Sequence, residues 1–179
     1  MAARGFLKLL EYAEKALKSG SGGQDSDRQK DVWSGVAFRL LGSNFVARMG
    51  EVVEVLSIPR YTVVPGVQDW MRGVSNVRGR LLPIMDLPVY FGAESRVHDS
   101  RRRVLVVDMH EIFSGLVVEE VFGIQHFPFL DYSAEPIQDI PSALTPYVEG
   151  MFWKDGQFWS IFNMGRLIQE PRFVQASAA

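Results

Sequence analysis

The 179-residue sequence contains no cysteine. Disulfides and thiolate metal sites are therefore excluded, and a reducing compartment fits the chain better than an oxidising one. The sequence also lacks any run of roughly 18 apolar residues, and its start lacks the successive basic, apolar and small-residue regions of a signal peptide. These absences predict a soluble, cytoplasmic protein that inserts no segment directly into a membrane.

Neither sign of charge is in large excess. Lys and Arg number 19 against 21 Asp and Glu, so the formal net charge is -2. Without a global basic field, nucleic acid is not the expected partner. The local basic run Arg101, Arg102 and Arg103 is interpreted as a solvated loop before a strand, in preference to a nucleic-acid site.

Signatures of catalysis are also missing. The three histidines, His98, His110 and His126, show none of the spacings typical of zinc sites. The sequence contains no G-x-S-x-G elbow and no phosphate-binding loop. We therefore expect no catalytic residue, no metal and no cofactor, and we do not expect an enzyme.

The hydrophobic residues that are present, 47% of the chain, occur in many short runs divided by Gly, Pro, Asn and Asp. This pattern is typical of a mainly β protein, built as a sandwich or barrel. One helical turn is expected over residues 69–73, and an irregular loop over 137–144. Strands are expected at residues 32–41, 44–56, 80–85, 103–109, 112–121, 148–153 and 157–162.

The N-terminal segment, residues 1–31, has a different pattern. Over residues 4–18 the apolar side chains recur at helical spacing, which predicts a short amphipathic helix with Phe6, Leu9, Leu10, Ala13 and Leu17 on one face. Residues 19–27 are small and polar, so they predict a flexible tether. The helix could pack on its own domain or dock on a partner, and the sequence leaves both options open.

An internal repeat organises the rest of the chain. Residues 73–87, GVSNVRGRLLPIMDL, align without a gap on residues 150–164, GMFWKDGQFWSIFNM. Both copies have a first glycine, a turn glycine six residues later, an apolar strand, and Asp86 or Asn163 as a helix cap. The repeat predicts two related small barrels that share strands or pack tightly together.

The two copies differ at the turn. The second has Asp155 and Gln157 around its glycine, an ordinary hairpin turn, where the first has Arg78 and Arg80. The arginines are thus additions that the turn does not require, and such additions often serve recognition. Glu54 interrupts an apolar strand and needs either a cation, for which Arg78 is the candidate, or an exposed position.

Aromatic residues gather in the second hairpin. Because neighbouring strand residues face opposite sides, two of them should fall on each face. Core packing explains one face, and the other is expected to be exposed. The residues are Phe152, Trp153, Phe158 and Trp159.

Residues 32 to about 170 resemble the CheW-like chemotaxis coupling proteins, bacterial adaptors that join a sensor histidine kinase to chemoreceptors. Residues 73–87 fit the family pattern G-V-x-N-x-R-G-x-x-x-P-I-x-D-L. Three features resemble the pilus-type, PilI-like branch, which serves twitching motility: the N-terminal extension, the stretch 45–50 without the usual Y-x-[IL]-x-[IL] pattern, and the bulky residues 70–72 before Gly73. Further segments that carry the resemblance are VVEVL at 52–56, FG at 91–92, VLVVD at 104–108 and GLVVE at 115–119.

The resemblance implies a mainly all-β fold of two five-stranded SH3-like barrels, preceded by the N-terminal helix and linker. The CheW-like domain would span residues 32–175, with one subdomain at about 46–99 and the other at about 32–45 plus 100–170. It also implies a non-catalytic adaptor, recruited to membrane receptor arrays. Its partners would be the regulatory domain of a CheA-like histidine kinase and the cytoplasmic tip of a methyl-accepting chemoreceptor, the latter bound in a groove between the barrels.

By this resemblance Glu54 and Arg78 occupy the positions of a functional acid and arginine pair, with Arg80 at the rim. An apolar floor would come from Val74, Val77, Leu82 and Ile84. Three alternatives stay open: a flagellar coupling protein, a free-standing SH3-like peptide or nucleic-acid module, and a small-molecule-binding barrel or hydrolase. The expected partner-binding residues are Glu54, Gly73, Val74, Asn76, Val77, Arg78, Gly79 and Arg80.

Overall fold

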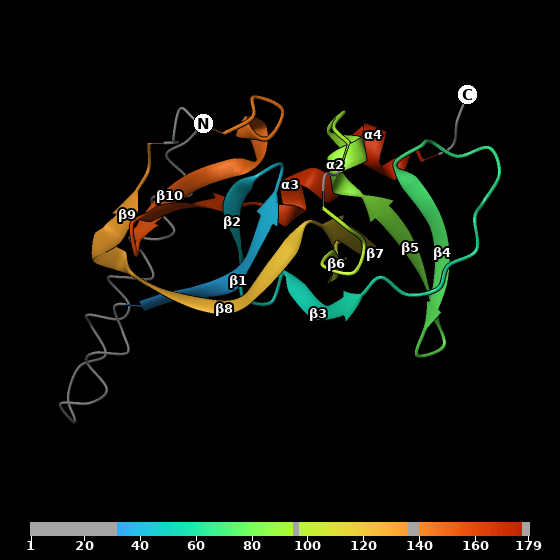
Figure 1. The fold of residues 1–179 in the computed structure, drawn as a ribbon, viewed down its shortest axis with the longest axis horizontal. Coiled ribbons are helices and arrows are strands. Elements are labelled where there is room, and N and C mark those ends of the chain that lie inside the picture. The colour runs from blue at the N-terminus through green and yellow to red at the C-terminus, as the bar shows by residue number, and fades with distance from the viewer. Residues whose placement is uncertain (1–31, 95–96, 136–139, 177–179) are drawn as a thin grey trace.

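The computed structural model describes residues 32–94, 97–135 and 140–176, so the predicted N-terminal helix and tether lie outside the described residues. As predicted, the chain is mainly β, and its strands form two sheets that lie side by side (Figure 1). The strands are β1 (Val32–Leu40), β2 (Ser43–Arg48), β3 (Val52–Ser57), β4 (Met71–Val77), β5 (Arg80–Asp86), β6 (Arg103–Met109), β7 (Ile112–Val118), β8 (Glu120–Pro128), β9 (Tyr132–Ser133), β10 (Val148–Lys154) and β11 (Gln157–Phe162). The helical turns are α2 (Leu87–Tyr90), η1 (Phe129–Asp131), η2 (Thr145–Tyr147), α3 (Met164–Ile168) and α4 (Pro171–Val174).

The two sheets are built on one plan. One has the order β3-β6-β7-β5-β4 and the other β8-β1-β2-β11-β10-β9, and each contains a single parallel pair at the same place, β5 with β7 and β11 with β2. The additional strand β9 also has a counterpart, because Thr62 forms an isolated bridge with Val74 of β4. The structure thus extends the repeat seen in the sequence to whole sheets.

Several element boundaries differ from the predicted ones. The expected strand 44–56 is divided into β2 and β3, which belong to different sheets, and Gly50 with φ of 90° lies between them. The expected strand 112–121 likewise contains β7 and the start of β8. Residues 69–73 form no helical turn, because the carbonyl of Trp70 already accepts the backbone N–H of Asp86 at 2.6 Å and β4 begins at Met71.

The division of the strands between the two sheets also differs from the expected subdomain ranges. Strands β6 and β7 follow residue 99, yet they lie in the sheet of β3, β4 and β5. Strands β1 and β2 return to the sheet of β8 to β11, as the resemblance implied. One sheet therefore takes residues 52–118, and the other takes the segments before and after it.

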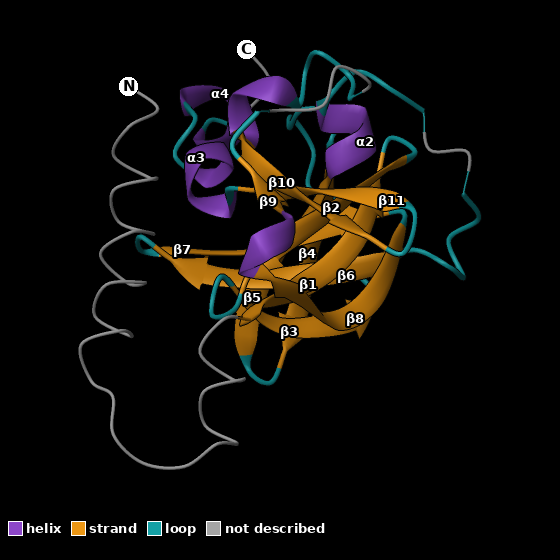
Figure 2. Ribbon diagram, turned by 90° about the vertical axis from the view of Figure 1, so that its left-hand side faces the viewer, coloured by secondary structure: helices purple, strands orange, loops and turns teal. Residues whose placement is uncertain are grey.

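Both predicted helix caps are present. The Asp86 side chain accepts the backbone N–H of Val89 at 3.4 Å, and the Asn163 side chain accepts that of Arg166 at 2.8 Å. Asp86 is the last residue of β5 and Asn163 directly follows β11, and each residue begins a short helix, α2 or α3. Figure 2 shows α2, α3 and α4 gathered along one side of the strands.

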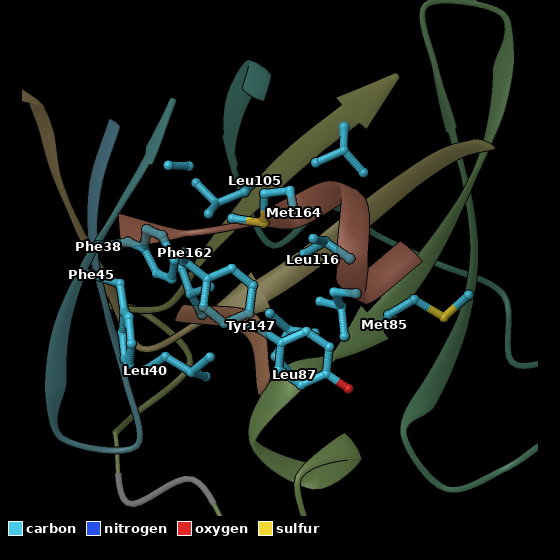
Figure 3. Packing of buried hydrophobic residues seen from close by; sticks show 14 of the residues in the cluster. Phe38, Leu40, Phe45, Met85, Leu87, Leu105, Leu116, Tyr147, Phe162 and Met164 are labelled. Atoms are coloured by element: carbon cyan, nitrogen blue, oxygen red, sulfur yellow. The ribbon is translucent and has the colours of Figure 1, made fainter. Parts of the chain in front are cut away.

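A common apolar core joins the two halves (Figure 3). It includes Phe38 and Phe162 from one sheet, Leu105 and Leu116 from the other, and Met164 from α3, all fully buried. Each sheet also encloses a smaller cluster of its own. Because the largest cluster draws on both sheets, the two barrels share one hydrophobic core.

Candidate partner-binding site

The arginine turn joins β4 to β5. Arg78 and Gly79 have φ of 52° and 82°, and the corresponding Asp155 and Gly156 of the second hairpin have 52° and 75°. Both hairpins therefore use the same left-handed turn, which Asp and Gly adopt easily and a long side chain adopts at a cost of about 1 kcal/mol. Asn76 supports the first turn, because its Oδ1 accepts the Gly79 N–H at 2.9 Å.

The predicted pair of Arg78 with Glu54 is present in the structure. Nη2 of Arg78 lies 2.6 Å from Oε1 of Glu54. Glu54 lies on β3 and Arg78 directly follows β4, and these two strands are the opposite edges of the five-stranded sheet. The ion pair therefore connects the two edge strands across the opening of the barrel that this sheet forms.

Arg80 is held by two contacts. Its Nη1 donates to Oδ2 of Asp108 at 2.7 Å, and its guanidinium lies 3.7 Å from the ring centroid of Phe113. The Arg80 side chain is still 56% exposed, as expected for a residue at the rim. Both arginines of the turn are thus oriented by the fold and still accessible from outside.

The remaining predicted residues have different environments. Gly73 is buried, and a Cβ there would lie 2.2 Å from the carbonyl oxygen of Thr62, so this glycine is required by close backbone packing. Leu82 and Ile84 are fully buried in the cluster of the first sheet, so the prediction that they form the floor of a groove is wrong. The four exposed members of the predicted set are Asn76, Arg78, Gly79 and Arg80, with Val74, Val77 and Glu54 half-buried.

A known protein family matches most of the chain. The CheW-like domain family matches residues 34–172. The chain belongs to the CheW family.

Among the relatives of this CheW-family chain, Protein PilI of Pseudomonas aeruginosa is 43% identical over 172 residues, covering 96% of each chain. A probable chemotaxis protein CheW of Rhizobium etli is 26% identical over 90% of this chain and 96% of its own length. The crystal structure of the scaffolding protein TtCheW from Thermoanaerobacter tengcongensis shares the fold, with a TM-score of 0.65 and 24% identity over 78% of this chain and 94% of its own. The similarity to PilI supports the pilus-type branch.

Sequence reasoning did not identify the exposed apolar residues beside the pair. Val53 and Val55 flank Glu54 on β3 and are 54% and 41% exposed, and Leu81 follows Arg80 and is 71% exposed. Strand alternation could have predicted this exposure. Because neighbouring strand residues face opposite sides, Val53 and Val55 lie on the face opposite to Glu54. The surface around the turn is therefore mixed, with cations next to apolar side chains.

The basic run is only in part the solvated loop that we expected, because Arg101 is exposed but Arg102 is buried and Arg103 begins β6. The Arg102 side chain is 3% exposed, and its Nη2 lies 2.7 Å from Oδ1 of Asp86, whose other oxygen lies 2.8 Å from Nε of Arg72. Burial raises the pKa of Asp99, but Arg72 and Arg102 outweigh it and lower that pKa overall. Arg102 is therefore committed to an internal ion-pair cluster, which disfavours the nucleic-acid alternative.

The arginine turn lines neither of two hollows on the described part of the chain. One, of about 730 Å³, includes Arg39 and Glu119, and the other, of about 320 Å³, includes Tyr90 and Glu170. Burial and a 3.0 Å hydrogen bond to Glu170 raise the pKa of Tyr90 to about 12, so this phenol stays protonated at neutral pH. Across residues 32–94, 97–135 and 140–176, no group of three or more acidic, His or Cys side chains could hold a metal. No helix within these ranges is long and apolar enough to cross a membrane.

Proposed function

We propose that this CheW-family protein is a non-catalytic scaffold that couples methyl-accepting chemoreceptors to a CheA-type histidine kinase. It binds the regulatory domain of the kinase and the cytoplasmic tip of the receptor, and it needs no cofactor or nucleic acid. It works in the cytoplasm, at receptor arrays to which it is recruited. Receptor state then biases kinase activity through the geometry of the assembly, since a coupling free energy between two sites requires no chemistry in the scaffold.

Within this proposal, the output is type IV pilus twitching motility. The 43% identity to Protein PilI over almost the whole chain supports this system over a flagellar one. The match to the probable chemotaxis protein CheW is lower, at 26%.

The arginine turn is the observation that carries the proposal. The Arg78 side chain is 79% exposed and that of Glu54 is 25% exposed, and ion pairs this accessible contribute at most about 1 kcal/mol to stability. That gain does little more than offset the left-handed backbone at Arg78. Stability therefore gives little reason for an arginine here, whereas recognition gives one, because a pre-oriented exposed arginine is a frequent energetic centre of protein interfaces.

The test is affinity capture from a bacterial extract with the full chain as bait. The native chain should recover a CheA-type kinase together with chemoreceptors. Arg78→Asn keeps the turn compatible with its left-handed angle and should reduce recovery of one of these partners about tenfold or more. The matched control is Arg101→Asn, which changes an exposed arginine of the loop before β6 and should leave recovery unchanged.

Two results would contradict the proposal. If the native chain recovers neither a kinase nor a receptor, the coupling function is wrong. If both partners bind equally well to the native chain and to Arg78→Asn, coupling can stand but the role of the arginine turn is wrong.

A further inference from the structure

A patch of large apolar side chains is exposed at one end of the six-stranded sheet. Trp153 and Phe158 pair across β10 and β11 with ring centroids 4.3 Å apart, and they are 48% and 43% exposed. Phe129 and Leu130 of η1 are 36% and 95% exposed. We name these four residues the terminal patch.

Strand register brings the two halves of the terminal patch together. Tyr132 of β9 pairs antiparallel with Phe152 of β10, so the residues just before Tyr132 run alongside those just after Phe152. η1 and β10 also contact one another. Leu130 and Trp153 therefore belong to one surface at this end of the sheet.

The N-terminal segment enters the described structure at the same place. Val32, the first residue of β1, pairs with Pro128, which immediately precedes Phe129. In Figure 1 the start of β1, β9 and the tip of the β10–β11 hairpin all lie at the left end of the molecule. Inside the barrel, the ring centroid of Trp33 is 5.2 Å from that of Phe152, the residue before Trp153, so β1 begins at the same end of the sheet as the patch.

The sequence of that segment fits this surface. A helix over residues 4–18 would be about 22 Å long, and one this short is marginally stable in water unless its apolar face is covered. A flexible linker of the length that separates this helix from Val32 would have a root-mean-square reach of about 20 Å, and it would keep the helix near the patch at an effective concentration in the millimolar range. We propose that residues 4–18 dock as an amphipathic helix on the terminal patch of their own chain.

Two comparisons favour this occupant. The hairpin itself does not require the aromatic pair, since the corresponding positions of the first hairpin are Asn76 and Leu81. The CheW-like domain match begins only at residue 34, whereas the similarity to Protein PilI covers 172 of the 179 residues and so extends into the N-terminal segment. Neither the N-terminal segment nor the aromatic pair is therefore required by the CheW-like fold.

A spin label tests the proposal in the full chain. The chain has no cysteine, so Lys8→Cys offers a single site for a nitroxide, and the four tryptophans supply indole N–H signals for NMR. Docking should broaden the Trp153 signal several-fold more than that of Trp70, which is buried in the other half of the molecule.

Variants separate docking from mere tethering. Leu9→Gln combined with Leu10→Gln removes part of the apolar face and should restore most of the Trp153 signal. Lys15→Gln combined with Lys18→Gln alters the opposite face by the same number of residues and should leave the broadening in place. Leu130→Ser changes a side chain that is 95% exposed, so it should weaken docking without unfolding the domain.

Two outcomes would overturn the proposal. One is a Trp153 signal that is equally broad in the native chain and in the Leu9→Gln, Leu10→Gln variant, since tethering alone would then explain it. The other is broadening that arises only when labelled and unlabelled chains are mixed, since that result would assign the terminal patch to a second copy.

Discussion

The β4–β5 and β10–β11 hairpins follow the same backbone path and carry different side chains. The left-handed position of the turn is Arg78 in one and Asp155 in the other, at the same φ of 52°. The second cross-strand pair from the turn is Asn76 with Leu81 in the first and Trp153 with Phe158 in the second. The shared backbone shows what the fold requires, and the differences mark the residues available for binding: cations on one barrel and aromatic rings on the other.

The contact between the first strand of each hairpin and the following helix cap also differs in charge. In the first half Arg72, just before Gly73, donates to the helix cap Asp86 at 2.8 Å. In the second half Glu149, just before Gly150, accepts from the helix cap Asn163 at 2.6 Å. In both halves a residue at the start of the strand thus bonds to the helix cap, but the strand residue is the cation in the first half and the anion in the second. In the first half Asp86 also forms an ion pair with the buried Arg102.

The largest effect is expected from Asp86→Asn. The amide can still cap α2, but the buried Arg102 is left with the exposed Asp99 at 3.4 Å, and loss of a buried ionic partner typically costs about 3–5 kcal/mol. Asn163→Asp in the second half should cost less, because Arg48 and Arg166 already lie at Glu149 and can compensate an added negative charge. Denaturant unfolding of both variants measures the difference, and equal losses would contradict an ionic origin of the asymmetry.

A smaller effect is expected from the first glycine of each repeat. A Cβ at Gly73 would meet the Thr62 carbonyl oxygen at 2.2 Å, whereas a Cβ at Gly150 would meet Tyr132 at 2.7 Å and the Ser133 carbonyl oxygen at 2.8 Å. Gly73→Ala should therefore lower the free energy of unfolding by about 2–3 kcal/mol, and Gly150→Ala by somewhat less.

Gly79→Ala is the control for these glycine variants. It has positive φ but no atom within 4 Å of an added Cβ, so it reports backbone strain alone, about 1 kcal/mol. Thermal unfolding can rank all three variants. A loss for Gly79→Ala as large as that for Gly73→Ala would show that close packing is not the cause.

Local chemistry explains why much of this comparison could be predicted from the sequence. A turn glycine, an Asp or Asn cap and period-two alternation can each be recognised from a few neighbouring residues. The repeat, both caps and the two faces of the aromatic hairpin were therefore predicted correctly. For Glu54 the strand pattern alone left two options, a cation or an exposed position, and the family resemblance favoured the pair with Arg78.

Features that depend on distant partners could not be predicted in this way. The burial of Arg102 follows from Asp86, which another strand supplies, and the run of three arginines gave no sign of it. The division of residues 44–56 between two sheets depends on which distant strand each half pairs with, β1 and β11 for β2 but β6 for β3. The Thr62 bridge, a single residue pair, has no sequence period to reveal it.

The smallest effect is expected from exchanging the turns themselves. Arg78→Asn loses an exposed ion pair but relieves the left-handed arginine, so unfolding should change by no more than about 0.5 kcal/mol, whereas Asp155→Arg should cost about 0.5–1 kcal/mol. A double-mutant cycle with Glu54→Gln and Arg78→Asn should give a coupling of about 0.2–1 kcal/mol that shrinks in high salt. A coupling well above 2 kcal/mol would make the pair a structural requirement, and the reason for assigning Arg78 to recognition would then disappear.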